Sequence, residues 1–235
     1  MKFYQNNAIK EIIEHNIQEI STPKKIISAS SNSSVWKENI GTIPAFIKRY
    51  KYPVPLRYIF RRGRGLAEFQ SYNAFSKYNF HHPDVLFFIE KRCFFCPIVS
   101  ILATEEINNS IDLHQLFILN QIEHSTRQKI IIELAQSLAE LHNNCFYHGD
   151  FKLRNILYQK DTQFLFWIDC PRGKKKIIFS HSRISDLVTL YKDIQGIWSL
   201  EEFSLFLTVY SKKTLIAEQS LKEKILTRYN KKYKK

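Results

Sequence analysis

Apolar and polar residues follow two different rhythms along this chain. Between Ala8 and Ile20, five isoleucines recur at helical spacing, which predicts a helix with one apolar stripe that ends at Ser21–Pro23: Ile9, Ile12, Ile13, Ile17 and Ile20. Residues 24–50 form short apolar runs separated by polar turns, a pattern typical of strands, with segments at 24–27, 35–37 and 43–48.

Further along, the pattern predicts a helix over Gly65–Tyr78 and a β-hairpin from 85–90 and 93–103, followed by helices. The segment Ser125-Thr126-Arg127-Gln128 resembles a capping box before a helical run of five apolar residues, and Ser199-Leu200-Glu201-Glu202 predicts a second helix start. Strands therefore come first and helices second, with a hinge near 104–110. This order predicts an α+β fold of two lobes, residues 1–106 and 107–235.

Composition places the chain among ordinary globular proteins, with 235 residues, 44% hydrophobic and 24% charged. The longest stretch without charges or amides, Cys93–Ala103, is too short to span a bilayer, which needs about 20 residues. The first twenty residues contain no signal-peptide apolar region. We therefore expect a cytoplasmic protein. Cys93 and Cys96 have the spacing of a zinc knuckle without a second ligand pair, so we expect buried thiols in the hairpin.

The chain is strongly basic, because 35 Lys and Arg residues against 22 Asp and Glu residues give a net charge of +13. Such a charge favours an anionic partner or reflects a lysine-rich, solvated surface, and the charge by itself leaves both open. Seven basic residues lie within positions 48–64: Lys48, Arg49, Lys51, Arg57, Arg61, Arg62 and Arg64. No nucleic-acid-binding module is recognisable, so nucleic acid is not expected as the partner.

One segment carries the chemistry: HGDFKLRNIL at 148–157, followed by the apolar run 164–168 that ends in Asp169. An acid after a buried strand suits a hard cation, and Asn155 can add a carbonyl oxygen to it. Asp150 is then free to accept a proton from an attacking hydroxyl or to orient it, while Lys152 neutralises a transferring phosphoryl group. The alternative is that these residues only form turns and end a strand.

The spacing Asp-x-Lys-x-x-Asn, with a strand-borne Asp nineteen residues after the first Asp, resembles the protein-kinase-like superfamily. Within it the chain is most similar to the lipopolysaccharide kinases, the bacterial Kdo and heptose kinases, over roughly residues 25–195. The motifs are HGDFKLRNIL, FWIDCPRG at 166–173, the helix with Glu68, TEEI at 104–107 and Asp186-Leu187. The resemblance implies a two-lobed kinase-like fold, ATP with Mg²⁺ (or Mn²⁺), and a sugar hydroxyl of a membrane-anchored, anionic glycolipid as acceptor.

The resemblance also implies roles for individual residues. The strand Ala45-Phe46-Ile47-Lys48 supplies the phosphate-binding Lys48, and Glu68 pairs with it. Asp150, Lys152 and Asn155 would be the catalytic residues, and Asn155 and Asp169 would bind the metal. The hinge that holds adenine includes Glu105 and Ile107, the turn over the phosphates includes Ser31 and Ser33, and Asp186 holds the catalytic-loop backbone.

Two departures from the family pattern bear on function. The turn Ser28–Ser34 lacks glycine, so its backbone amides approach phosphate less closely, although serine hydroxyls can donate. Asp169-Cys170-Pro171 replaces Asp-Phe-Gly, which indicates a fixed segment without a switch. Asp186 follows Asp169 by only 17 positions, which favours a small acceptor over a docked peptide.

The residues after Pro171 add a second basic stretch, with Arg172, Lys174, Lys175, Lys176 and Arg183. Together with Arg57–Arg64 they suit an anionic glycolipid and peripheral contact with the inner membrane surface, or form a solvated basic face. A compact bacterial protein kinase and a pseudokinase scaffold remain alternatives.

Overall fold

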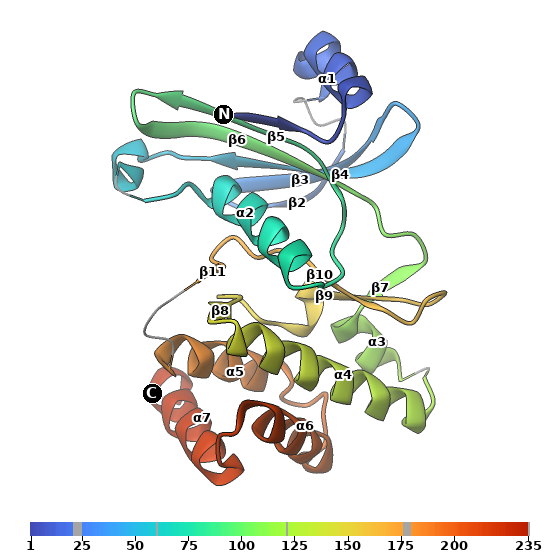
Figure 1. Ribbon diagram of the computed structural model, residues 1–235, viewed down its shortest axis with the longest axis vertical. Coiled ribbons are helices and arrows are strands. Elements are labelled where there is room, and N and C mark those ends of the chain that lie inside the picture. Colours follow the sequence, from blue (N-terminus) through green and yellow to red (C-terminus); the bar gives the residue numbers. More distant parts are fainter. Residues whose placement is uncertain (21–24, 60, 121, 176–179, 235) are drawn as a thin grey trace. The chain divides into compact units, whose positions relative to one another are not determined.

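The computed structural model of the chain describes residues 1–20, 25–59, 61–120, 122–175 and 180–234 (Figure 1). The predicted helix end at Ser21–Pro23 and the basic residue Lys176 lie outside the described residues, as do the side chains of Ile17, Ile20 and Lys174. The chain forms two compact units. Unit 1 comprises Met1–Ser76 and His82–Asn108, and unit 2 comprises Lys77–His81 and Asn109–Lys235.

Unit 1 is built on a six-stranded antiparallel sheet in the order β1-β5-β6-β4-β3-β2. Its strands are β1 (Lys2–Tyr4), β2 (Ile26–Ala29), β3 (Ser33–Ile40), β4 (Ile43–Lys51), β5 (Val85–Cys93) and β6 (Cys96–Glu105). The predicted strands and hairpin are confirmed, although Lys24 lies outside the described residues and the predicted turn Ser28–Ser34 is shorter, because β2 continues to Ala29 and β3 begins at Ser33. The pattern missed β1, whose three residues are too few to show a period. Gly41, between β3 and β4, has φ +63°, a conformation that suits glycine.

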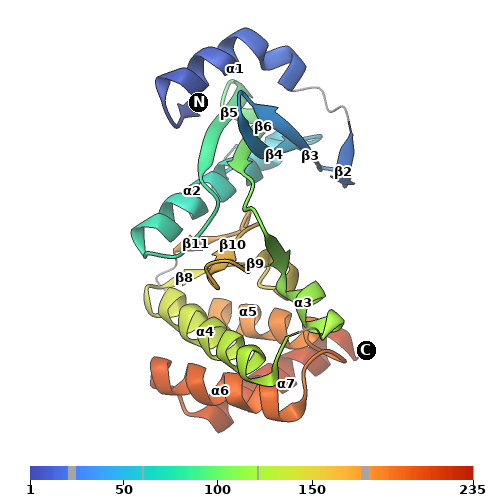
Figure 2. The same ribbon diagram turned by 90° about the vertical axis from the view of Figure 1, so that its right-hand side faces the viewer.

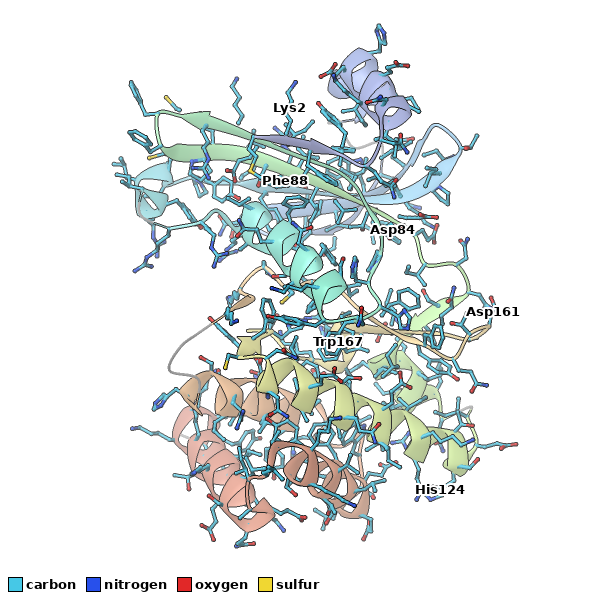
Figure 3. All side chains as sticks on the ribbon, viewed as in Figure 1. Lys2, Asp84, Phe88, His124, Asp161 and Trp167 are labelled. Carbon is cyan, nitrogen blue, oxygen red and sulfur yellow. The ribbon has the colours of Figure 1, made fainter. Side chains whose placement is uncertain are left out.

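Two α-helices and a 3₁₀ turn complete unit 1: α1 (Asn7–Ile20), η1 (Pro55–Tyr58) and α2 (Arg64–Lys77). The predicted apolar stripe of α1 is confirmed at Ile9 and Ile13, which are buried against Trp36 and Ala45 of the sheet. On α2, Phe69 stacks on Phe88 of β5, which is labelled in Figure 3, with ring centroids 4.9 Å apart. These contacts attach both helices to the sheet.

Unit 2 is mostly helical. It contains α3 (Leu113–Leu119), α4 (His124–Asn143), α5 (Ser180–Asp193), α6 (Leu200–Thr214) and α7 (Glu218–Tyr233). Short strands form two small sheets: β10 (Leu165–Trp167), β9 (Ile156–Gln159) and β7 (Ser110–Asp112) in one, and β11 (Lys174–Lys175) with β8 (Phe146–Tyr147) in the other. Figure 2 shows α4, α5, α6 and α7 gathered on the same side of these strands.

The segment Lys77–His81 joins unit 2 although the chain around it belongs to unit 1. The backbone N–H of Trp167, labelled in Figure 3, donates to the His81 carbonyl at 2.9 Å. The His81 ring stacks on Phe164 with centroids 4.3 Å apart. Strand β10 is thereby fixed from both sides, because its other edge pairs with β9.

Two local predictions are wrong. The helix α4 begins at His124 with Glu123 as its N-cap and no capping side-chain hydrogen bond, so the Ser125 capping box does not form. Its apolar run is nevertheless buried as expected: Ile130, Ile131, Leu134, Leu138 and Leu141. In the hairpin, Cys93 is exposed and Cys96 half-buried, because they flank a tip that projects beyond the core. The capping box at Ser199 is confirmed, with Glu202 as its second member.

Candidate active site

The loop after β8 is held by one buried carboxylate, Asp186 of α5. Its Oδ2 accepts the backbone N–H of His148 at 2.7 Å, and its Oδ1 accepts that of Gly149 at 2.8 Å. Asp186 is fully buried, so both bonds are made away from water. Hydrogen bonds to a buried carboxylate are among the stronger ones in proteins. The position of HGD in the chain is therefore set from a helix nearly forty residues further on.

A third group completes this anchor. His142 Nε2 lies 3.3 Å from Asp186 Oδ2, and its Nδ1 lies 2.6 Å from the Tyr210 hydroxyl. A carboxylate only accepts hydrogen bonds, so Nε2 carries the proton and Nδ1 accepts from the tyrosine O–H. Burial lowers the pKa of His142 and outweighs the attraction of Asp186, which keeps the ring neutral.

His148 lies inside the same loop and is also fully buried. Burial lowers its pKa, although the charges of Asp186, Asp169 and Asp150 each raise it. The imidazole Nε2 lies 3.3 Å from the Ile168 carbonyl, and its ring contacts Phe151 edge-to-face at 5.8 Å. His148 thus ties the loop to the residue that precedes Asp169.

Asp150 and Lys152 form a close pair at the rim of this loop. Lys152 Nζ lies 2.8 Å from Oδ1 and 3.0 Å from Oδ2 of Asp150, and both side chains are about one-third exposed. The backbone amide of Leu153, next in sequence, donates to Asp193 Oδ2 at 2.8 Å. A carboxylate and an ammonium group are thereby presented together to solvent from a fixed backbone.

Asn155 faces the same loop from the short 3₁₀ turn η2 (Leu153–Asn155). Its Nδ2 donates to the Asp150 carbonyl at 2.8 Å, which leaves the amide oxygen as the atom available to a cation. Its own carbonyl accepts the backbone N–H of Ile168 at 3.0 Å, so Asn155 is fixed beside the residue that precedes Asp169. An amide oxygen and a carboxylate are hard donors of the kind Mg²⁺ takes, so these residues fit the implied metal.

The segment that begins at Asp169 packs directly onto the HGD loop. Asp169 has φ +53°, a left-handed conformation uncommon for a residue other than glycine. Cys170 is buried, and its Sγ lies 3.2 Å from the His148 carbonyl. At Gly149, with φ +84°, an added Cβ would come within 2.6 Å of Arg172 Cβ. Glycine is therefore required there both by its backbone conformation and by the close approach of Arg172.

Unit 1 holds the remaining predicted residues, beginning with Lys48 of β4 and Glu68 of α2. Lys48 Nζ lies 3.1 Å from Glu68 Oε2, and the Glu68 side chain is 3% exposed. The hydroxyls of Tyr50 and Tyr72 also donate to the Glu68 carboxylate. Glu68 is thus held by Lys48 and by two tyrosine hydroxyls, and Lys48 remains partly exposed beside the Tyr50 ring, 5.2 Å from its centroid.

The serine turn between β2 and β3 is stabilised by its own side chain. Ser30 Oγ accepts the backbone N–H of Ser33 at 3.1 Å and lies 2.9 Å from Ser33 Oγ. The N–H of Ser30 donates to the Ser33 carbonyl at 2.7 Å. Ser31, in contrast, lies exposed at the tip. Of the two serines predicted to contact phosphate, Ser33 is engaged within the turn and Ser31 is accessible.

The predicted hinge follows β6. Glu105 pairs with Ala45 of β4, and its N–H donates to the Asp84 carbonyl at 2.9 Å. Glu106 is tied through its N–H to the Pro44 carbonyl and through its carboxylate to Lys37 Nζ, 2.5 Å away. Ile107 is the second residue after the strand ends, and it is half-buried.

Sequence reasoning missed three residues of the loop anchor: His142, Asp193 and Tyr210. His142 stands at the end of a helix whose pattern indicated only core, and the other two lie on later helices. None belongs to a short motif, so no local signal pointed to them. Within the described part of the chain, no cluster of three His, Cys, Asp or Glu side chains could hold a metal ion, and no helix has the length and apolarity to cross a membrane.

The catalytic-loop residues of unit 2 and the Lys48–Glu68 pair of unit 1 are the features by which the sequence resembles protein-kinase-like enzymes. A solved structure titled "WaaP in complex with acyl carrier protein" is similar with a TM-score of 0.74 over 99% of both chains, at 15% sequence identity. At that identity the similarity shows the fold alone, and it confirms the predicted fold class.

The family follows from the sequence. The model of the lipopolysaccharide kinase (Kdo/WaaP) family matches residues 50–210, more than half of the chain. The chain belongs to this family, as the motifs predicted. No curated protein matches the chain.

Proposed function

We propose that this kinase transfers the γ-phosphoryl group of ATP to a sugar hydroxyl of the lipopolysaccharide core or a similar glycolipid. The observation that carries the proposal is the catalytic loop of unit 2. There, one buried carboxylate, Asp186, fixes the backbone that presents Asp150, Lys152 and Asn155. The family assignment supports the acceptor class.

In this proposal Asp150 is the residue that orients the acceptor hydroxyl and accepts its proton. Lys152 holds both oxygens of that carboxylate, which restricts its rotation. The same ammonium group places a positive charge where negative charge moves during phosphoryl transfer. The pair therefore combines a proton acceptor and an electrostatic stabiliser on residues two positions apart.

Asn155 and Asp169 are the residues that would hold Mg²⁺ or Mn²⁺. When bound, the cation would supply positive charge that offsets the negative charge of the phosphate oxygens. In unit 1, Lys48 would bind the phosphates from a position fixed by Glu68. The hinge backbone at Glu105 and Ile107 would receive the adenine, and Ser31 and Ser33 would cover the phosphates.

The test is nucleotide binding followed by transfer. Wild type and Asp169→Ala are compared by thermal shift with ATP, with Mg²⁺ present or absent, beside the control Asp161→Ala, an exposed acid hydrogen-bonded to Asn109. A ligand at 100 times its dissociation constant stabilises a protein by about 2.7 kcal/mol. We expect a Mg²⁺-dependent shift in wild type and Asp161→Ala that is lost in Asp169→Ala.

Radiolabelled ATP then identifies the acceptor. Label that appears in lipopolysaccharide and depends on Asp150 and Asp169 supports the proposal. Label in protein and none in glycolipid would instead indicate a protein kinase. The absence of any shift at millimolar ATP would favour a pseudokinase scaffold.

A further inference from the structure

Two aromatic side chains project from the tip of the β5–β6 hairpin in unit 1. Phe94 is 94% exposed and Phe95 is 77% exposed. They form the two-residue turn between Cys93 and Cys96, which are paired across the hairpin, and Phe94 adopts φ +51°. Exposed aromatic pairs are unfavourable in water, and where they occur they commonly mark interaction sites.

A second exposed apolar segment lies beside this hairpin. The turn η1 contacts β6, and the N–H of Tyr52 donates to the Ile98 carbonyl at 3.3 Å. Figure 1 shows η1 next to the hairpin end of the sheet. Around this point four further apolar side chains are between 41% and 71% exposed: Val54, Leu56, Ile59 and Ile98.

A basic cavity of about 140 Å³ opens next to these residues. Three arginines contribute to its lining, together with the tip of the serine turn and the residues around η1: Asn32, Pro53, Val54, Arg57, Tyr58, Arg61 and Arg64. In the described part of the chain, none of these three guanidinium groups has a hydrogen bond or an ion pair. The sequence has no acid from Gly41 to Ala67, so no carboxylate nearby in sequence offsets the charge.

We propose that this end of unit 1, the docking face, binds an anionic phospholipid bilayer. The docking face consists of the hairpin tip, η1 and the arginine cavity. Phe94, Phe95 and Leu56 enter the interfacial layer, where aromatic side chains are favoured. Arg57, Arg61 and Arg64 bind lipid phosphates. The inference deepens the proposed function and rests on it for its biological purpose, since an acceptor anchored in a membrane requires the enzyme at that surface.

Charge selects the bilayer over a second copy of this chain. A symmetric contact between two docking faces would bring like charges together, because the face has arginines and no nearby acid in its sequence segment. An anionic membrane offers phosphates for the arginines and an apolar layer for the phenylalanines. Both features lie on one face, as peripheral membrane binding requires.

The experiment measures co-sedimentation of the full chain with vesicles, without nucleotide or acceptor. Vesicles of phosphatidylcholine alone are compared with vesicles containing phosphatidylglycerol. Two variants change the docking face: Phe94→Ser/Phe95→Ser and Arg57→Gln/Arg61→Gln/Arg64→Gln. Matched controls on unit 2 are Leu200→Ser, at a position 84% exposed, and Lys212→Gln/Lys213→Gln/Lys222→Gln, at exposed positions.

We expect wild type and both controls to prefer the anionic vesicles. Each arginine near such a surface contributes about fivefold to partitioning, so the triple variant should lose about 100-fold at low salt, and less at high salt. The phenylalanine variant should lose more than about tenfold. A Phe94→Trp variant should show a blue-shifted emission that brominated lipids quench.

Three outcomes would overturn the inference. The first is vesicle binding that both docking-face variants leave unchanged, or that falls equally in the controls. The second is absence of binding to anionic vesicles. The third is a change of oligomeric state in the phenylalanine variant without a change in vesicle binding, which would assign the tip to a contact between copies. Because nucleotide and acceptor are absent, none of these outcomes depends on the proposed phosphoryl transfer.

Discussion

Replacing Asp186 with Asn tests whether one carboxylate holds the catalytic loop. The side chain keeps its size but can accept through one oxygen only. In the native protein Oδ2 accepts from His148 N–H and faces His142, while Oδ1 accepts from Gly149 N–H. If the amide oxygen stays toward Gly149, an NH₂ group then opposes the buried N–H of His148. His142 can adapt by moving its proton to Nδ1, since the Tyr210 hydroxyl can also accept.

The expected cost follows from this count. One buried backbone donor is left without a partner, which costs about 1–3 kcal/mol, and the remaining bond to Gly149 loses its charge assistance. Asp186→Asn should therefore lower the free energy of unfolding of unit 2 by about 2–4 kcal/mol. Asp193→Asn is the matched control, because this half-buried carboxylate accepts a single backbone bond, from Leu153 at 2.8 Å. It should cost about 1 kcal/mol.

Urea unfolding measures both costs, and hydrogen exchange reports on the loop directly. We expect faster exchange in a peptide that contains His148 and Gly149 in Asp186→Asn, but not in Asp193→Asn. Phosphoryl transfer should fall at least tenfold, because the backbone that presents Asp150 is no longer fixed. A cost below about 0.5 kcal/mol, or a cost no larger than that of Asp193→Asn, would refute the anchoring role.

Two further predictions concern buried groups. Glu68→Gln should raise the KM for ATP and lower the free energy of unfolding by about 1–3 kcal/mol, because Lys48 loses its carboxylate partner. Steady-state kinetics measure the KM, with the exposed Glu14→Gln as the control. An unchanged KM would contradict the prediction. Stability should decline as the pH falls below about 6.5, because burial lowers the pKa of His142 and of His148 in the folded state and the unfolded chain takes up the protons. The free energy of unfolding should change with pH by up to about 1.4 kcal/mol per pH unit for each histidine. His142→Gln should therefore reduce this slope by about half in urea titrations at pH 5.5–7.5. A slope that His142→Gln leaves unchanged would count against the lowered pKa of His142.

The predicted catalytic residues were readable because they lie close together in sequence. Asp150, Lys152 and Asn155 occupy six consecutive positions, so the loop conformation alone brings them together. The strand pattern likewise predicted that Lys48 lies on a strand, and it lies on β4, because the apolar pattern of this segment is visible locally. The fold class followed from the order of such segments, with strands first and helices second.

The missed features depend on partners far away in the chain. Strand β1 has three residues and exists because it pairs with β5, more than eighty residues later. Helix α7 is rich in charged residues, and only Leu221 and Ile225 are buried, so its sequence resembles a basic tail. The Ser125 capping box shows the reverse case. There the local motif is present, but α4 begins two residues earlier than the motif predicts, and Glu123 takes the N-cap position.

The serine turn shows how a departure from a family pattern is accommodated. A glycine-rich turn leaves its amides free to approach phosphate, whereas here Ser30 Oγ already accepts the N–H of Ser33. The hydroxyl therefore stabilises the turn without a ligand. A phosphate placed there exchanges an existing hydrogen bond for a new one and gains less free energy than it would from an unpaired amide. In the proposed kinase, a larger share of nucleotide affinity would then fall to Lys48, whose position depends on the buried Glu68.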